Sequence, residues 1–388
     1  MVRAAILSAA MCTMASDMII VPILDLLYSA FSEYSVTVVA LAYNIAGFAF
    51  IPASLLTPYL CRKYSMRKLM LAGTLLCLIG GGLGGLSENL YYIIGMHFVE
   101  GIGAGFCTNI IPIYIARLCT DERDVLRMDA WNGTVGTLLG FLVTICSGQA
   151  ASLFGWQKAY FVYFLELTVL FLQICFLPDT EPEKADVEGN EELRGKTLTP
   201  RVLRWLAEVF VFALFINLMW THQAGYLAEN GLGGADVSGI ASGIIQIGGF
   251  LASFAIAPVM QRVKTYYQNV SFALFILSAA VMLNAGTAIH FYIASMIWGL
   301  GQGLIYPYLW AEATLIAPNE RTVSSVISWT TIGWYLAVGM TTIVYARIAA
   351  VFHNESSTFA MHVVLAAFVI LSVYRFVAGS IEKRRGIL

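Results

Sequence analysis

Ionisable side chains inside apolar stretches are the residues of this sequence that could do chemistry. The first is Asp17, in the run ASDMIIVP, roughly twelve residues into an apolar segment of about twenty-five. A charge at mid-membrane costs about 2.5–3.5 kcal/mol on insertion scales, so such a carboxylate should face protein or water. There it either binds and releases a proton or forms a structural hydrogen bond with a neighbouring helix. We expect Asp17 to take part in proton coupling.

A histidine and a carboxylate form the second candidate group. His97 and Glu100 are three residues apart in an apolar segment, which places them on one face of a helix. An imidazole beside a carboxylate can share or relay a proton, or the pair can make a structural hydrogen bond between helices. We expect Glu100 and His97 to join Asp17 in proton coupling.

Polar and aromatic residues gather in three later apolar segments and are candidates for substrate binding. They are Asn217, Trp220, His222 and Gln223 in the first segment, Tyr308 and Glu312 in the second, and Ser328 and Trp329 in the third. Acids and aromatic faces together attract cationic groups. Aromatic residues at such places are also common as core or lipid contacts.

The composition points to a membrane protein. Of the 388 residues, 59% are hydrophobic and only 12% are charged, whereas soluble domains are about 25% charged. The seven cysteines are scattered and form no CxxC pair, so the sequence predicts small buried side chains rather than a disulfide framework or a metal site. No basic tract indicates nucleic-acid binding.

Apolar segments long enough to span a membrane recur along the chain and predict twelve transmembrane helices. They are expected near residues 5–29, 36–60, 69–86, 91–117, 130–153, 159–178, 203–228, 237–260, 268–285, 289–316, 323–349 and 358–380. The segment 179–200 has seven acids against three bases and reads as a polar linker. It divides the chain into domains 1–178 and 201–388.

The distribution of basic residues predicts the orientation. With both termini in the cytoplasm, twenty of the 22 Lys and Arg residues fall on the cytoplasmic side, and only Lys158 and Arg347 fall outside. Such a bias follows the positive-inside rule. We therefore expect a multi-pass protein of the cell inner membrane with both termini cytoplasmic.

The two halves of the chain repeat one another. The repeated positions are Pro58, Leu60 and Arg62 with Pro258, Met260 and Arg262 (an offset of 200), and Gly101, Gly103 and Gly105 with Gly299, Gly301 and Gly303 (an offset of 198). Small residues allow close approach of membrane helices. Two homologous halves around a central site are the architecture of a rocking transporter.

Local motifs resemble the major facilitator superfamily over essentially the full length. The segment PYLCRKYSMRKLMLAG is similar to the family signature between spans 2 and 3, with Arg62 where an aspartate is usual. HFVEGIGAG is similar to the R-x-x-Q-G pattern of span 4, and the string at Asp17 resembles span 1 of twelve-span bacterial drug:proton antiporters. The antiporter signature of span 5 survives only as Gly136 and Gly140. The resemblance implies an all-α integral membrane protein of twelve helices in two pseudo-symmetric six-helix bundles.

These observations predict a proton-coupled secondary transporter of a small organic solute that works by alternating access, exporting drug-like compounds. Arginines at the cytoplasmic helix ends are expected to form charge pairs that close the inner gate; they are Arg62, Arg117, Arg123, Arg262 and Arg321. The expected partners are the solute, protons and the bilayer, and the chain is expected to be a monomer without a cofactor.

Two alternatives remain open. The eroded span 5 motif is compatible with a metabolite:proton uptake symporter, and a non-transporting membrane sensor could share the fold. An enzyme is not expected, because no GxSxG, HExxH or P-loop motif is present.

Overall fold

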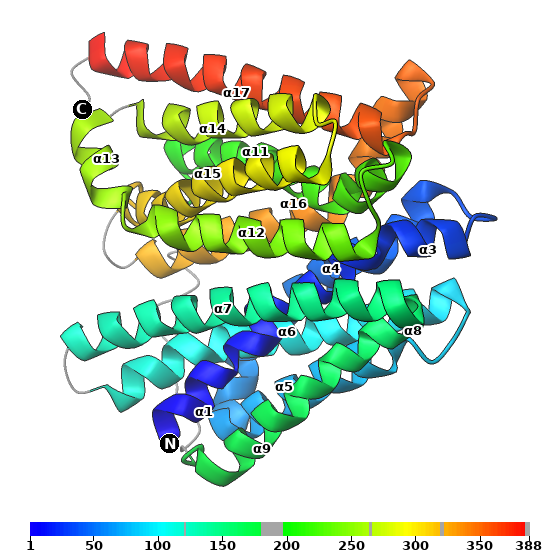
Figure 1. Cartoon of the computed structure of the whole chain (residues 1–388). Helices are drawn as coiled ribbons and strands as arrows, with labels where there is room; N and C mark the ends of the chain where they lie inside the picture. The colour runs from blue at the N-terminus through cyan, green and yellow to red at the C-terminus, as the bar shows by residue number, and fades with distance from the viewer. Residues whose placement is uncertain (120–121, 180–196, 264–265, 319–321, 385–388) are drawn as a thin grey trace.

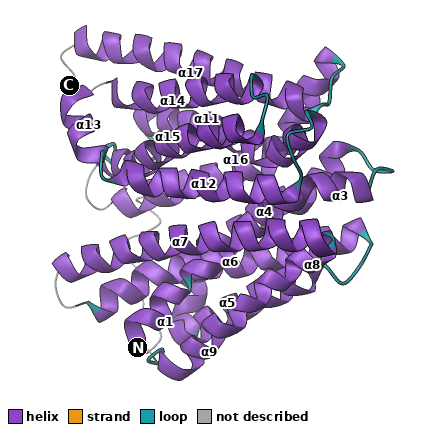
Figure 2. Cartoon of the chain, in the orientation of Figure 1, coloured by secondary structure: helices purple, strands orange, loops and turns teal. Residues whose placement is uncertain are grey.

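The protein is almost entirely helical. The structure, a computed structural model, describes residues 1–119, 122–179, 197–263, 266–318 and 322–384. Helices occupy these ranges throughout, with short loops between them (Figure 2). The expected linker lies mostly outside the described residues.

The helices pack as two groups, one from each half of the chain (Figure 1). The first group contains α1 (Val2–Ser8), the π-helical turn η1 (Met11–Ala15), α2 (Ser16–Ile20), the 3-10 turn η2 (Val21–Ile23), α3 (Leu24–Ala30), α4 (Val36–Lys63), α5 (Met66–Gly84), α6 (Leu90–Leu118), α7 (Glu122–Phe154), α8 (Trp156–Ala159), the 3-10 turn η3 (Tyr160–Leu165) and α9 (Glu166–Phe176). The second group contains α11 (Pro200–Glu229), α12 (Ala235–Ser253), α13 (Ile256–Val263), α14 (Tyr267–Leu283), α15 (Ala288–Leu315), α16 (Val323–Phe352) and α17 (Ser357–Arg384). We call them the first and second bundle.

The expected spans are present as helices. Among the described residues, ten helices are long and apolar enough to cross a membrane, and a bent pair, Val2–Thr13 with Met18–Ala30, forms one more. The apolar helix α14 corresponds to the expected ninth span but has only 17 residues. These segments account for the twelve expected positions.

Three spans expected to be continuous helices are interrupted instead. The first span bends by 52° next to η1, because an extra residue in a helical turn breaks the regular hydrogen-bond ladder. The eighth span ends at Ser253 and resumes at Ile256; Pro258 follows, and its missing N–H cannot bond four residues back. The sixth span contains the 3-10 turn η3 before α9.

Helix starts are fixed by local caps. Asn89 Oδ1 accepts the backbone N–H groups of Tyr91 (2.9 Å) and Tyr92 (3.3 Å) at the start of α6. Thr199 Oγ1 accepts the N–H of Val202 at 3.3 Å ahead of α11, with Pro200 in the first turn. Such side chains satisfy backbone donors that have no partner inside the helix.

The repeated glycines pack each bundle in the same way. A Cβ added at Gly101 would lie 2.5 Å from Ala46 O of α4, and one at Gly103 would lie 2.5 Å from Gly73 O of α5. In the second bundle, Gly299 meets α12 and Gly301 meets α14. Helices α6 and α15 are therefore each held between two neighbours at backbone contact, as the sequence repeat predicts.

The most extensive contacts between the bundles are made by two helix pairs, α4 with α16 and α7 with α12. Near the helix midpoints, the rings of Phe50 on α4 and Tyr335 on α16 stack with their centroids 3.5 Å apart. Close to the end of α7, a Cβ at Gly148 would lie 3.1 Å from Gly239 Cα in the first turns of α12. We call the end at which α1 begins and α17 ends the terminal end (left in Figure 1). These contacts lie between the midpoints and the opposite end.

The glycine packing gives a first prediction. Gly103→Ala should lower the free energy of unfolding by about 1–3 kcal/mol, because the added methyl group forces α5 and α6 apart. The melting temperature of the detergent-purified protein measures the effect. Gly95→Ala on the same helix is the matched control, because a Cβ there meets nothing within 4 Å. Equal melting temperatures for the two variants would contradict the packing argument.

Candidate functional site

A buried polar junction joins the two bundles near mid-helix. Asn217 of α11 donates from Nδ2 to Asn44 Oδ1 of α4 (2.5 Å) and to Thr341 Oγ1 of α16 (3.2 Å). Its Oδ1 accepts the hydroxyl of Tyr43 at 3.4 Å. Asn44 Nδ2 in turn donates to Thr221 Oγ1 at 3.4 Å. Of the predicted substrate-binding residues, Asn217 is therefore placed between the bundles, hydrogen-bonded to both.

The other predicted residues of α11 point to different neighbours. His222 Nδ1 lies 3.2 Å from Ser357 Oγ of α17, and its ring packs edge-on against Tyr345 of α16. Gln223 Nε2 donates to Ser242 Oγ of α12 at 2.7 Å. Trp220 is buried in the core. The four residues are close in sequence, but they do not form one surface.

The remaining predicted substrate residues lie nearer the terminal end. Tyr308 of α15 packs against Tyr267 of α14, with ring centroids 5.2 Å apart, inside the second bundle. Glu312, one helical turn further, is half-buried. Ser328 and Trp329 of α16 are exposed. The structure therefore does not bring this group together with Asn217.

The acid–imidazole pair forms a separate site, inside the first bundle. His97 Nδ1 lies 2.5 Å from Glu100 Oε2, and both side chains are only 2% exposed. Two buried tyrosines complete the group: the hydroxyl of Tyr163 donates to Glu100 Oε1 at 3.1 Å, and that of Tyr160 lies 3.1 Å from His97 Nε2. Close approach of α5 allows this arrangement, because Gly81 lies against the Tyr163 ring.

The geometry suits the pair to holding one exchangeable proton. With the imidazole charged, the pair is neutral overall and both ring nitrogens donate, one to Glu100 and one to Tyr160. With the imidazole neutral, only one ring nitrogen donates and the other accepts. The partners at both ring nitrogens can therefore accommodate either form of the imidazole.

The other predicted ionisable residues are placed less completely. Asp17 lies in α2, and its side chain is outside the described part of the chain, as is that of Arg123 on α7. Arg321 also lies outside the described residues. Arg62, Arg117 and Arg262 are exposed at the terminal ends of α4, α6 and α13. Their roles in gating stay predictions.

Sequence reasoning missed several partners in these sites. Tyr43, Asn44 and Thr341 at the junction, and Tyr160 and Tyr163 beside the acid pair, were not singled out. A signal was available for Asn44, an amide in the apolar run LAYNIAGF. The tyrosines give no such signal, because aromatic residues are common throughout these helices.

Comparison with known proteins gives consistent results. The sequence profile of the family described as Major Facilitator Superfamily matches residues 6–342. The sugar transport protein MST3 of Oryza sativa subsp. japonica is 29% identical over 148 residues, 38% of this chain. That match spans only 28% of the length of MST3.

Two further matches cover most of this chain, one by sequence and one by structure. The multi-drug resistance efflux pump PmrA of Streptococcus pneumoniae is 24% identical over 346 residues, covering 84% of this chain and 83% of PmrA. The crystal structure of the nucleoside transporter NupG superimposes with a TM-score of 0.79 at 10% identity, covering 97% of this chain and 99% of that one.

The junction leads to a second prediction. Asn217→Ala should lower the free energy of unfolding by about 1–3 kcal/mol, because it leaves the buried Asn44 Oδ1 without this donor. The melting temperature in detergent is again the measurement. Asn284→Ala is the control, since within the described residues the side-chain amide of this exposed residue donates only to Ala280 O of α14, the helix that it follows. If Asn284→Ala were as destabilising as Asn217→Ala, the hydrogen bonds of the junction would contribute no more to the free energy of unfolding than an exposed one.

Proposed function

Because the chain belongs to the Major Facilitator Superfamily, we propose that it is a proton-coupled carrier of a small organic solute and exports drug-like compounds. Membership makes the chain a membrane transporter and not an enzyme, with a small-molecule substrate and the lipid bilayer as its partners. Proton coupling, the direction of transport and a monomeric state are the proposed parts.

Alternating access is supported by the position of the contacts between the bundles. The junction at Asn217 and the stacked Phe50–Tyr335 pair lie near the helix midpoints. Beyond them, toward the opposite end, Tyr28 of α3 donates to the backbone carbonyl of Thr221 at 3.3 Å. We interpret this arrangement as a state closed at the opposite end. Rocking about the midpoints would close the terminal end in turn.

The basic residues support an orientation for this state. If the terminal end is cytoplasmic, as the Lys and Arg bias predicts, the structure represents an inward-facing carrier in the inner membrane. The exposed Arg62, Arg117 and Arg262 would then lie at the inner gate. On rocking, they would come into reach of acids from the facing bundle.

The buried His97–Glu100 pair is the single observation that carries the proposal of proton coupling. It places an imidazole and a carboxylate of span 4 in direct contact, and the hydroxyls of two tyrosines of span 6 bond to them. Because α6 is in backbone contact with α4 through Gly101, a change at the pair can be transmitted to the helix that carries Asn44. Asp17 is proposed as a further proton-coupling residue.

Export is favoured by the relative that matches along most of the chain, since PmrA is described as an efflux pump. Uptake of a metabolite with protons is the second candidate. It is favoured by the amide and hydroxyl groups at the junction, Asn44, Asn217 and Thr341, which can bond to a polar solute when the bundles part.

A third prediction tests coupling. In proteoliposomes, Glu100→Gln should abolish the response of solute flux to an imposed pH gradient while leaving solute exchange at equal pH within about threefold of wild type. The amide keeps the size of the side chain but no longer forms an ion pair with the imidazolium. Glu88→Gln, an exposed carboxylate at the loop before α6, is the control. Gradient-driven flux that survives in Glu100→Gln would remove this pair from the coupling mechanism.

A fourth prediction separates export from uptake. Cells that overexpress the chain should tolerate higher concentrations of cationic amphipathic drugs than cells carrying Glu100→Gln, and should accumulate less of a fluorescent drug. Faster accumulation of a radiolabelled sugar or nucleoside, without any change in drug tolerance, would instead establish the uptake symporter.

A further inference from the structure

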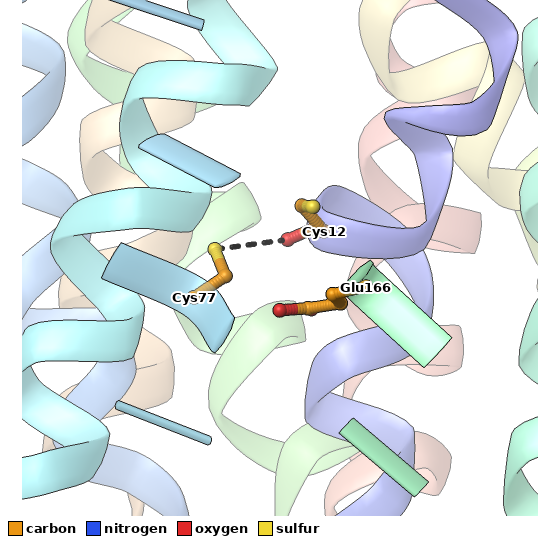
Figure 3. A group of neighbouring side chains, drawn as sticks. All are labelled: Cys12, Cys77 and Glu166. Carbon is orange, nitrogen blue, oxygen red and sulfur yellow. Dashed lines mark hydrogen bonds between the residues drawn. The ribbon is translucent and has the colours of Figure 1, made fainter. Parts of the chain in front are cut away.

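Two thiols and a carboxyl group converge inside the first bundle, apart from the His97–Glu100 pair. Cys12 comes from η1, Cys77 from the middle of α5 and Glu166 from the first turn of α9 (Figure 3). Their Sγ and carboxylate atoms all lie within 4.8 Å of one another, and all three side chains are fully buried. Spans 1, 3 and 6 thus each contribute one potential metal ligand to the same point.

The carboxyl group lacks the partners that such a group requires. Both oxygens of Glu166 are buried and have no hydrogen-bond partner within the described part of the chain. A buried carboxyl group without donors is strongly unfavourable. A bound cation is one way to compensate it, and the two sulfur atoms beside it are ligands for one.

The thiols are held by weak contacts that a metal ion could replace. Cys77 Sγ lies 3.6 Å from the carbonyl oxygen of Glu100 and 4.0 Å from that of Cys12. Cys12 Sγ donates to Thr74 Oγ1 at 3.8 Å. Sulfur hydrogen bonds of this kind are weak, so exchanging them for metal–sulfur bonds costs little.

The backbone at two of these residues departs from the regular α-helix. Cys12 lies in a π-helical turn, and Glu166 lies where the 3-10 turn η3 changes into α9. Single π-helical turns are frequent at functional sites, because the extra residue turns a side chain away from its regular direction. Here two irregular segments direct their side chains to one point.

From this convergence we propose that Cys12, Cys77 and Glu166 bind a zinc ion. Zinc takes thiolate sulfur at about 2.3 Å and carboxylate oxygen at about 2.0–2.2 Å, so its ligand atoms lie about 3.5 Å apart. Side-chain rotations that move the ligand atoms by about 1 Å would bring the three atoms to that spacing. Binding releases the two thiol protons, and the two thiolates and the carboxylate around Zn²⁺ then carry a net charge of −1. That charge equals the charge of an ionised Glu166 alone, but the carboxylate now has a ligand bond in place of no partner.

The consequence of zinc binding is mechanical. The ion would tie η1, at the bend of span 1, to α5 and α9 within the first bundle. Beyond that bend, span 1 continues through η2 and α3, which contact α12 and α11 of the second bundle. Zinc would therefore stiffen the segment that links the two bundles. This inference does not depend on proton coupling or on the direction of transport.

Metal analysis of the purified chain tests the site. The protein is expressed in zinc-supplemented medium, purified in detergent with a reducing agent and no chelator, and analysed by mass spectrometry for metal content. We expect about one zinc ion per chain. Cys77→Ser and Glu166→Gln should each lose most of it. Cys175→Ser should retain it, because that exposed cysteine of α9 lies outside the group.

Cobalt substitution gives a readout that needs no variant. Co²⁺ supplied in place of zinc should give a thiolate-to-metal charge-transfer band in the wild type and in Cys175→Ser. Wild-type protein without zinc and without this band would overturn the proposal, even if Cys77→Ser failed to fold. Zinc retained by Glu166→Gln would also overturn it, because the carboxyl group would then hold only a proton.

Discussion

Lipid offers no hydrogen bonds, so every polar group within these helices must find its partner inside the protein. That constraint explains most of the structure. It pairs His97 with Glu100 and Tyr160, directs Asn217 to Asn44 and Thr341, and turns Gln223 toward the serines of α12. Where it is not met, as at Glu166, the structure points to an occupant from outside the chain.

Backbone contact at glycine is what brings these polar groups within reach of one another. Gly73 and Gly103 let α5 and α6 touch, and Gly81 on the same face of α5 makes room for Tyr163. The equivalent contacts of Gly299 and Gly301 build the second bundle by the same means. The acid–imidazole pair is not repeated, because Ser295 and Trp298 of α15 stand at the positions equivalent to His97 and Glu100 at the offset of 198. The two halves share their packing, and the ionisable pair belongs to the first half alone as far as the sequence shows.

Much of the fold could be predicted from the sequence, because hydrocarbon imposes length and composition on every span. The twelve positions and the glycine repeat follow from that constraint, and the proximity of His97 and Glu100 follows from helical periodicity. The interruptions were harder to predict. No residue type in the sequence indicates the π-helical turn at Met11–Ala15. Pro258 is compatible with a helix break nearby, but it does not by itself show that the helix ends at Ser253.

The candidate sites were predicted less well than the fold. Asn217, His222 and Gln223 share a helix but face α4, α17 and α12, and the direction of a side chain depends on neighbours that one helix cannot reveal. The group at Cys12, Cys77 and Glu166 was not expected either, because its three members are far apart in sequence and no spacing rule joins them.

The place of the His97–Glu100 pair has a consequence for how such carriers diversify. Within the described residues, the side-chain partners of the pair all come from helices of one half, away from the contacts on which the halves meet. Substitutions that remodel that surface therefore leave the hydrogen bonds of the pair intact. In the proposed carrier, solute specificity and proton coupling would therefore rest on separate sets of residues and could change independently of each other.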